Sequence, residues 1–158
     1  MLSVAPLSQG PGYYLEIANI NYYAEGGEPL PTWHGTVAKE FGLSGVAAEL
    51  EVRRTCAGYH PTSGEALVQN AGSEKRNPGH DLTFSAPKSV SIAWATADEA
   101  MRKAIQIQQD KAVRDALDFL EAKAGFARVG RNGEQVVKAP LLFALFEHGT
   151  SRAMDPQL

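Results

Sequence analysis

Apolar side chains recur at helical spacing from about residue 98 to 124, which predicts a long amphipathic helix. They lie three, four or seven positions apart, at Met101, Ile105, Ala112, Val113, Ala116, Leu117 and Leu120. Thr96 and Glu99 have the spacing of a capping box at its start, and Gly125 is a natural stop. The stripe predicts about seven turns packed on an apolar surface.

Other patterns predict strands. Residues 2–8 and 80–89 alternate apolar and polar side chains, and the second segment should stop as a strand at Pro87. The segment "FARVGRNGEQVVK", residues 126–138, has the form strand, turn, strand of a hairpin. Residues 141–151 predict a long apolar strand.

The remaining chain predicts short helices and loops. Residues 36–42 and 44–58 read as helices that end at glycines, and residues 25–35 and 59–79 as loops, the second with room for a short hairpin. "SVSIAWA", residues 89–95, fits a strand or a helix equally well. Since strands and helices do not alternate regularly, the predicted class is α+β, a mostly antiparallel sheet with helices packed on it.

Composition limits the protein class. The 158 residues suit one domain or a large piece of one, and they include a single cysteine, Cys56, which can form no internal disulfide. No signal peptide or membrane-spanning run is evident, so we expect a cytoplasmic protein. The net charge of −3 argues against a uniformly basic nucleic-acid binder but allows a local basic cleft. Candidates for that cleft are Arg53, Arg54, Lys75, Arg76, Lys88 and Arg152.

The segment "GYYLEIANINYY", residues 12–23, holds four of the five tyrosines and has helical character. Packing is one interpretation and nucleophilic chemistry is the other, since a phenol attacks a phosphodiester when a base or a metal assists. Tyr13 and Tyr22 are nine positions apart, which is half a turn around an unbroken helix. Either the segment breaks near residues 18–21, or the two tyrosines act at different moments.

Other catalytic signatures are missing. The sequence has no phosphate-binding glycine loop and no paired-cysteine or HExxH metal motif. Its four histidines are far apart in sequence. Asp81, at the start of one predicted strand, and His148, at the end of another, are plausible partners for a tyrosine.

Three motifs carry a family resemblance. "DLTFSAPKSVS" (residues 81–91), "FEHGTSRAMDPQL" (146–158) and the two tyrosine pairs followed by "WHGTVAKEFGLSG" (33–45) resemble the N-terminal domain of TrwC/TraI-type conjugative relaxases. These form the MobF class of HUH endonucleases. The resemblance spans nearly the whole chain and implies an incomplete HUH palm-like fold.

The resemblance also implies a reaction. Such enzymes nick one strand of origin-of-transfer DNA, and a tyrosine becomes attached to the 5′ phosphate. The nucleophile falls on Tyr13, with Tyr22 the candidate for a second strand transfer. Asp81 takes the position of an aspartate that assists the tyrosine and orients a metal-binding histidine, and His148 that of one of three histidines binding a divalent metal such as Mg²⁺ or Mn²⁺.

Four further residues are candidates for contacts with DNA. Tyr14 and Tyr23 are expected either to pack within the protein or to stack on bases, and Lys88 and Arg152 to contact phosphates. Single-stranded and origin-of-transfer DNA are the expected partners, with relaxosome accessory proteins or a coupling protein also possible.

In the family a His-x-His motif follows "DPQL", whereas this sequence ends at Leu158. We therefore expect residues 1–158 to be the N-terminal part of a single relaxase domain, with weak metal binding and poor nicking by itself. Two alternatives stay open: an inactive relaxase that binds single-stranded DNA or a partner, and one half of a split enzyme.

Overall fold

The computed structural model describes residues 1–7, 29–149 and 158. Its strands are β1 (Leu2–Pro6), β2 (Thr32–His34), β3 (His80–Phe84), β4 (Phe126–Val129), β5 (Gln135–Lys138) and β6 (Phe143–Leu145). Its α-helices are α3 (Thr36–Glu40), α4 (Glu49–Ala57), α5 (Lys88–Thr96) and α6 (Glu99–Ala124). The predicted tyrosine helix lies outside the described residues.

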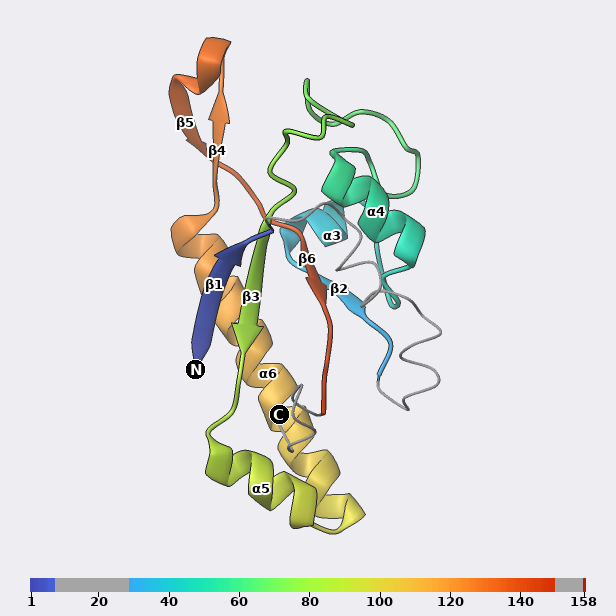
Figure 1. Cartoon of the computed structure of the whole chain (residues 1–158), viewed down its shortest axis with the longest axis vertical. Coiled ribbons are helices and arrows are strands. Elements are labelled where there is room, and N and C mark those ends of the chain that lie inside the picture. Colours follow the sequence, from blue (N-terminus) through green and yellow to red (C-terminus); the bar gives the residue numbers. More distant parts are fainter. Residues whose placement is uncertain (8–28, 150–157) are drawn as a thin grey trace.

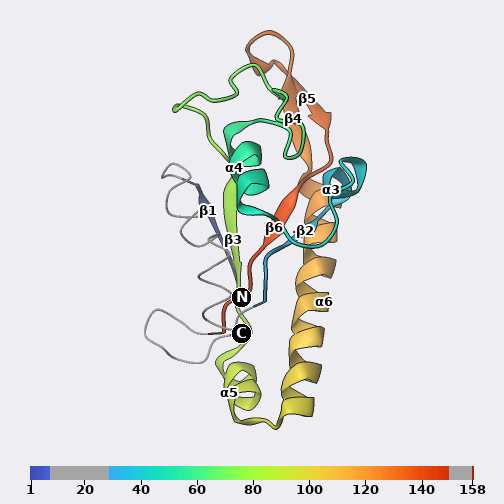
Figure 2. The ribbon, with the colours of Figure 1, turned by 90° about the vertical axis from the view of Figure 1, so that its right-hand side faces the viewer.

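Within the described part of the chain, the strands form three two-stranded antiparallel sheets, β1–β3, β2–β6 and β4–β5. Helix α6 runs alongside the strands, with α5 at one end of the molecule and the β4–β5 hairpin at the other (Figures 1 and 2). The expected mixture of helices and antiparallel strands is confirmed, with small sheets.

A small apolar core lies between the β2–β6 sheet and helices α3 and α4. Trp33, Ala38, Ala47 and Val52 are buried together there. The indole N–H of Trp33 donates to Glu51, 3.1 Å away, which also accepts from the backbone N–H of Ala48 at the start of α4.

Several predicted elements are confirmed. Helix α3 and the hairpin occur as expected, and the long helix ends at the predicted residue, before Gly125. Helix α4 ends where Gly58 adopts a left-handed conformation with φ of 88°, which suits glycine. The ambiguous segment 89–95 belongs to helix α5.

Four details were predicted wrongly. Helix α6 is capped by Asp98, whose carboxylate accepts from the N–H of Met101 at 2.8 Å, while the Thr96 hydroxyl donates back to Ile92. Helix α4 starts five residues later than expected, at Glu49. The predicted loop 25–35 contains strand β2, and β6 has only three residues. The last two errors share a cause, because β2 and β6 exist only through pairing with each other.

Candidate functional site

Asp81 is positioned by the β1–β3 ladder. It faces Ala5 across the ladder, one pair from the end at which the chain leaves β1. The backbone N–H of Leu7 continues the ladder by donating to Gly79 at 3.0 Å. The half-buried Asp81 makes at least one further interaction. The carboxylate therefore lies beside the point from which the chain continues toward the tyrosines.

His148 follows strand β6 by three residues and is exposed. Its neighbour Glu147 accepts a hydrogen bond from the amide of Gln106 on α6 at 2.9 Å, which ties this segment to the long helix. His148 itself also has an interaction partner. Helix α6 thus supports the chain on which the predicted metal ligand lies.

Lys88 begins α5 and is exposed, beyond the far end of β3 from Asp81. Leu158 lies close by in the fold, because its carbonyl accepts from the N–H of Ala86 at 2.7 Å and its N–H donates to the hydroxyl of Ser91 at 3.2 Å. Ser91 is only 1% exposed. Leu158 therefore lies at the junction between β3 and α5.

Of the described candidate residues, Asp81 lies near one end of β3, Lys88 lies beyond the other end, and His148 follows β6. The predicted site residues Tyr13, Tyr14, Tyr22, Tyr23 and Arg152 lie outside the described residues.

The described residues do not make a metal site by themselves, since no group of three or more His, Cys, Asp or Glu side chains among them is arranged to hold an ion. His34 hydrogen-bonds to Asp118 at 2.8 Å, and Nδ1 of His60 accepts from the backbone of Thr62 and Ser63. Both imidazoles thus have structural partners. His148 supplies one donor, and one imidazole is too few for a site.

A polar cluster that the sequence did not reveal connects β2 and α3 to α6. Arg114 on α6 donates to the hydroxyl of Thr32 at 3.2 Å and lies 3.4 Å from Nδ1 of His34. Two helical turns further on, Glu121 accepts from the backbone N–H groups of Thr36 and Leu141. These contacts hold the β2–β6 pair, and with it the segment of His148, against the helix.

The pKa of Glu121 reflects this position. Desolvation by burial opposes the charged carboxylate, but the hydrogen bonds from Leu141 and Thr36 outweigh it and lower the pKa of Glu121 below its ordinary value. Cys56 shows the opposite balance, because burial raises the pKa of its thiol while Arg76 opposes that effect. Cys56 is thus a protonated, half-buried packing residue at neutral pH.

Most of the expected basic-cleft residues that are described have intramolecular partners. Arg53 pairs with Glu49 at 2.6 Å, Arg54 donates to the carbonyls of Pro61 and Thr62, and Arg76 donates to the carbonyl of Cys56. These hydrogen bonds hold α4 and the loop after it.

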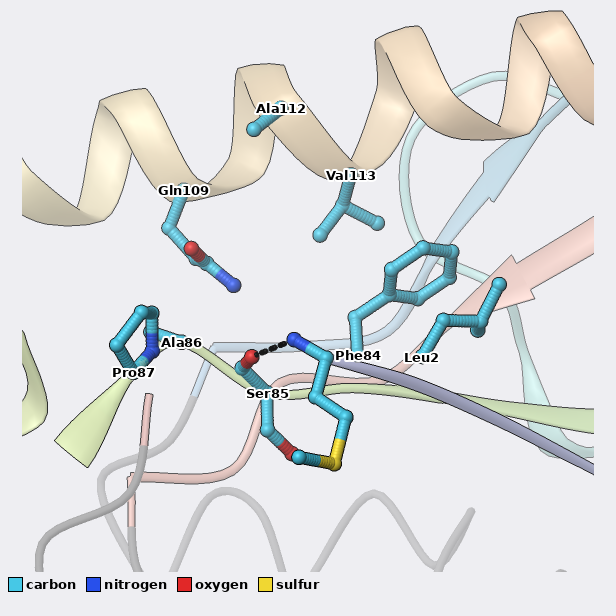
Figure 3. A pocket seen from close by; sticks show the side chains of 9 residues that line it. Leu2, Phe84, Ser85, Ala86, Pro87, Gln109, Ala112 and Val113 are labelled. Carbon is cyan, nitrogen blue, oxygen red and sulfur yellow. Dashed lines mark hydrogen bonds between the residues drawn. The ribbon is translucent and has the colours of Figure 1, made fainter.

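A hollow of about 320 Å³ opens between the start of β1, the end of β3 and helix α6 (Figure 3). Its lining is mostly apolar, and Phe84 and Val113 face each other across it. The amide of Gln109 points into the hollow, and the terminal ammonium of Met1 donates to the carbonyl of Ser85. None of the described candidate site residues lines it.

The fold and this arrangement agree with the family comparison. The family model "TrwC relaxase" matches residues 7–158, so the chain belongs to the TrwC relaxase family. The multifunctional conjugation protein TraI of Escherichia coli is 41% identical over 143 residues, 87% of this chain and 8% of that protein. The TraI of E. coli strain K12 is 37% identical over 166 aligned positions, covering 100% of this chain and 9% of that protein.

Solved structures of the conjugative relaxase TrwC have the same fold. Its metal-bound complex with oriT DNA superposes with a TM-score of 0.76 at 33% identity, covering 99% of this chain and 54% of that one. The metal-free complex gives 0.76 at 34% identity, covering 99% and 53%. A complex with a 27-mer DNA comprising the recognition hairpin and the cleavage site gives 0.75 at 33%, covering 99% and 52%. The chain spans about half of these solved relatives and under a tenth of the TraI proteins.

Proposed function

We propose that this chain is the N-terminal part of a conjugative relaxase domain that nicks one strand of origin-of-transfer DNA. The observation that carries the proposal is the match to the TrwC relaxase family over residues 7–158, a range that includes Tyr13, Asp81 and His148. The similarity in fold to TrwC bound to oriT DNA supports it.

The proposed chemistry is a transesterification. The phenol oxygen of Tyr13 attacks the scissile phosphorus, an O–P bond to tyrosine forms, and the bond from phosphorus to the 3′ oxygen breaks. The phenol proton leaves with help from Asp81, and the released 3′ oxygen takes up a proton. One phosphodiester replaces another, so the strand can later be rejoined, and Tyr22 is the proposed nucleophile for a second transfer.

Chain connectivity favours the pairing of Tyr13 with Asp81. Leu7 is held beside the start of β3, and Tyr13 follows six residues later. Six residues span at most about 22 Å even when fully extended. The chain connection is therefore short enough for Tyr13 to reach the carboxylate that is proposed to assist it.

His148 is proposed as one donor to a divalent metal such as Mg²⁺ or Mn²⁺, which would supply charge stabilisation at the phosphate when bound. The described residues do not complete that site, and no step above depends on the metal. A fully assembled site would need further donors beyond His148.

The proposed partner is single-stranded origin-of-transfer DNA, with Tyr14 and Tyr23 stacking on bases and Lys88 and Arg152 on phosphates. Relaxosome accessory proteins or a coupling protein are proposed as further partners, with the bacterial cytoplasm as the place of action. No helix in the described residues is long and apolar enough to cross a membrane.

In the test, the protein at its natural length is incubated with Mn²⁺ and a labelled oligonucleotide that carries the element's own nick site. We expect a covalent adduct that resists denaturant with wild-type protein and the matched control Tyr14→Phe, and none with Tyr13→Phe. An adduct that persists in Tyr13→Phe refutes the nucleophile assignment, and no adduct with any variant refutes the enzymatic proposal.

A binding module that does not cut is the second candidate function. It predicts that the same oligonucleotide is retained in a gel-shift assay while no adduct forms. A split enzyme predicts that a second chain supplying the remaining histidines restores the adduct.

A further inference from the structure

The β4–β5 hairpin, residues 126–138, is basic in an acidic chain. It carries Arg128, Arg131 and Lys138 against one acid, Glu134, whereas the whole chain has a net charge of −3. We call this segment the basic hairpin. It stands at one end of the molecule, at the C-terminal end of α6 (Figures 1 and 2).

Strand pairing gathers two of the cations. Phe126 faces Lys138 across the ladder and Arg128 faces Val136. Residues opposite each other, and residues two apart on a strand, point to the same side of a sheet. One face therefore presents two cations alternating with Phe126 and Val136, whose side chains are 54% and 57% exposed.

These cations lack acidic partners in the part of the chain that the structure describes. Arg131 has no side-chain hydrogen bond there, and Arg128 reaches only the carbonyl of Gly133 at 3.4 Å. Lys138 lies 4.8 Å above the ring of Phe126 and donates to the carbonyls of Glu121 and Ala122 at the end of α6. By contrast, Arg53 and Arg114 pair with carboxylates on their own helices.

We propose that the basic hairpin binds the phosphate backbone of origin DNA. This rests on the proposed function, which supplies DNA as the substrate. Exposed cations without carboxylate partners neutralise phosphates and release the counterions condensed on DNA, which increases affinity. A cation that is already paired with a carboxylate contributes less to this affinity. The contact adds affinity and orientation without reading base sequence.

The basic hairpin stands at the end of the molecule where β3 begins, and Asp81 is the second residue of that strand (Figure 1). Origin DNA that is held at Asp81 can therefore extend onto the hairpin.

The test uses the protein at its natural length and the double variant Arg128→Ser/Arg131→Ser. Lys138 is left intact because it closes the end of α6. The control is Lys39→Ser/Lys103→Ser, which removes the same charge from exposed lysines on α3 and α6. Binding to origin DNA is measured by fluorescence anisotropy at several salt concentrations, and adduct formation is measured with the same DNA at saturation.

We expect the hairpin variant to bind origin DNA about tenfold more weakly than the control, with a salt-dependence slope smaller by about 1.5 to 2. At saturating DNA, adduct formation should match the control. A failure of the proposed function would appear separately, as absence of a Tyr13-dependent adduct in the wild-type protein.

Two results would overturn the proposal. One is equal affinity and salt slope for the hairpin variant and the control, which would indicate that the basic hairpin does not contact DNA. The other is a loss of adduct formation at saturating DNA, or a lower melting temperature, for the hairpin variant, which would place the effect at the cut site or in the fold.

Discussion

Glu121 connects three segments that are distant in sequence, and its replacement gives a direct measure of how they are held together. Its carboxylate accepts from the N–H of Leu141 at 2.7 Å and from the N–H of Thr36 at 3.2 and 3.3 Å. Hydrogen bonds to charged groups contribute about 1.5–3 kcal/mol each, and partial exposure puts these near the lower limit. Glu121→Ala should therefore reduce the free energy of unfolding by about 2–3 kcal/mol.

Glu121→Gln should cost less, about 1–2 kcal/mol, because one carbonyl acceptor remains while the charge is lost. At about 2–4 °C per kcal/mol for a chain of this size, the melting temperature should fall by about 5–10 °C for the alanine variant. The assay is thermal unfolding followed by circular dichroism at pH 7. The control is Glu40→Gln, an exposed acid at the end of α3.

The pH dependence follows from the lowered pKa. The native carboxyl ionises below its ordinary value of 4.5, so its stabilisation is complete above that pH and is lost as pH falls through the lower native pKa. Wild type and Glu121→Gln should therefore differ at pH 7 and converge as the pH falls below the lowered native pKa of Glu121. The reasoning is refuted if Glu121→Gln and Glu40→Gln have the same melting temperature at pH 7.

Two further substitutions test local geometry. Asp98→Ala removes the cap on the Met101 N–H and should cost about 1 kcal/mol in chemical denaturation; an unchanged midpoint would show that the cap is dispensable. Gly35→Ala places a methyl group 2.5 Å from the carbonyl oxygen of Leu141 at φ of 99°, and should cost about 2–4 kcal/mol. The control Gly130→Ala has a similar backbone conformation, with φ of 83° and ψ of −179° against φ of 99° and ψ of 171° at Gly35, and open space around it. It should cost less, about 1–2 kcal/mol, and equal losses would refute the proposed clash.

Local signals in the sequence predicted the elements whose stability is local. The stripe from Met101 to Leu120 predicted α6, and the Arg131–Gly133 turn predicted the hairpin, in which Asn132 adopts a φ of 63°. Segment 89–95 stayed ambiguous because three-residue and two-residue periods both fit it. The structure places it in a helix that packs on α6.

Pairing between distant segments was not predictable in the same way. Nothing in "TWH" or "FAL" alone marks a strand, and each becomes one only against the other. The basic hairpin was missed for a related reason, because Arg128 and Lys138 are ten positions apart and share a face only once the hairpin forms. The motifs containing Asp81 and His148 pointed to the family, whereas the support of the His148 segment by Gln106 and Glu121 depends on the fold.

The pairing of β2 with β6 also has a consequence for synthesis of the chain. Thr32 meets Leu145 across that ladder, 113 positions later. At about 5–20 residues per second, the ribosome takes roughly 5 to 25 seconds to supply the partner strand. During that interval β2 and the apolar surface around Trp33 emerge without their partner. Nascent chains of this family should therefore recruit chaperones until residues near 145 leave the ribosome exit tunnel.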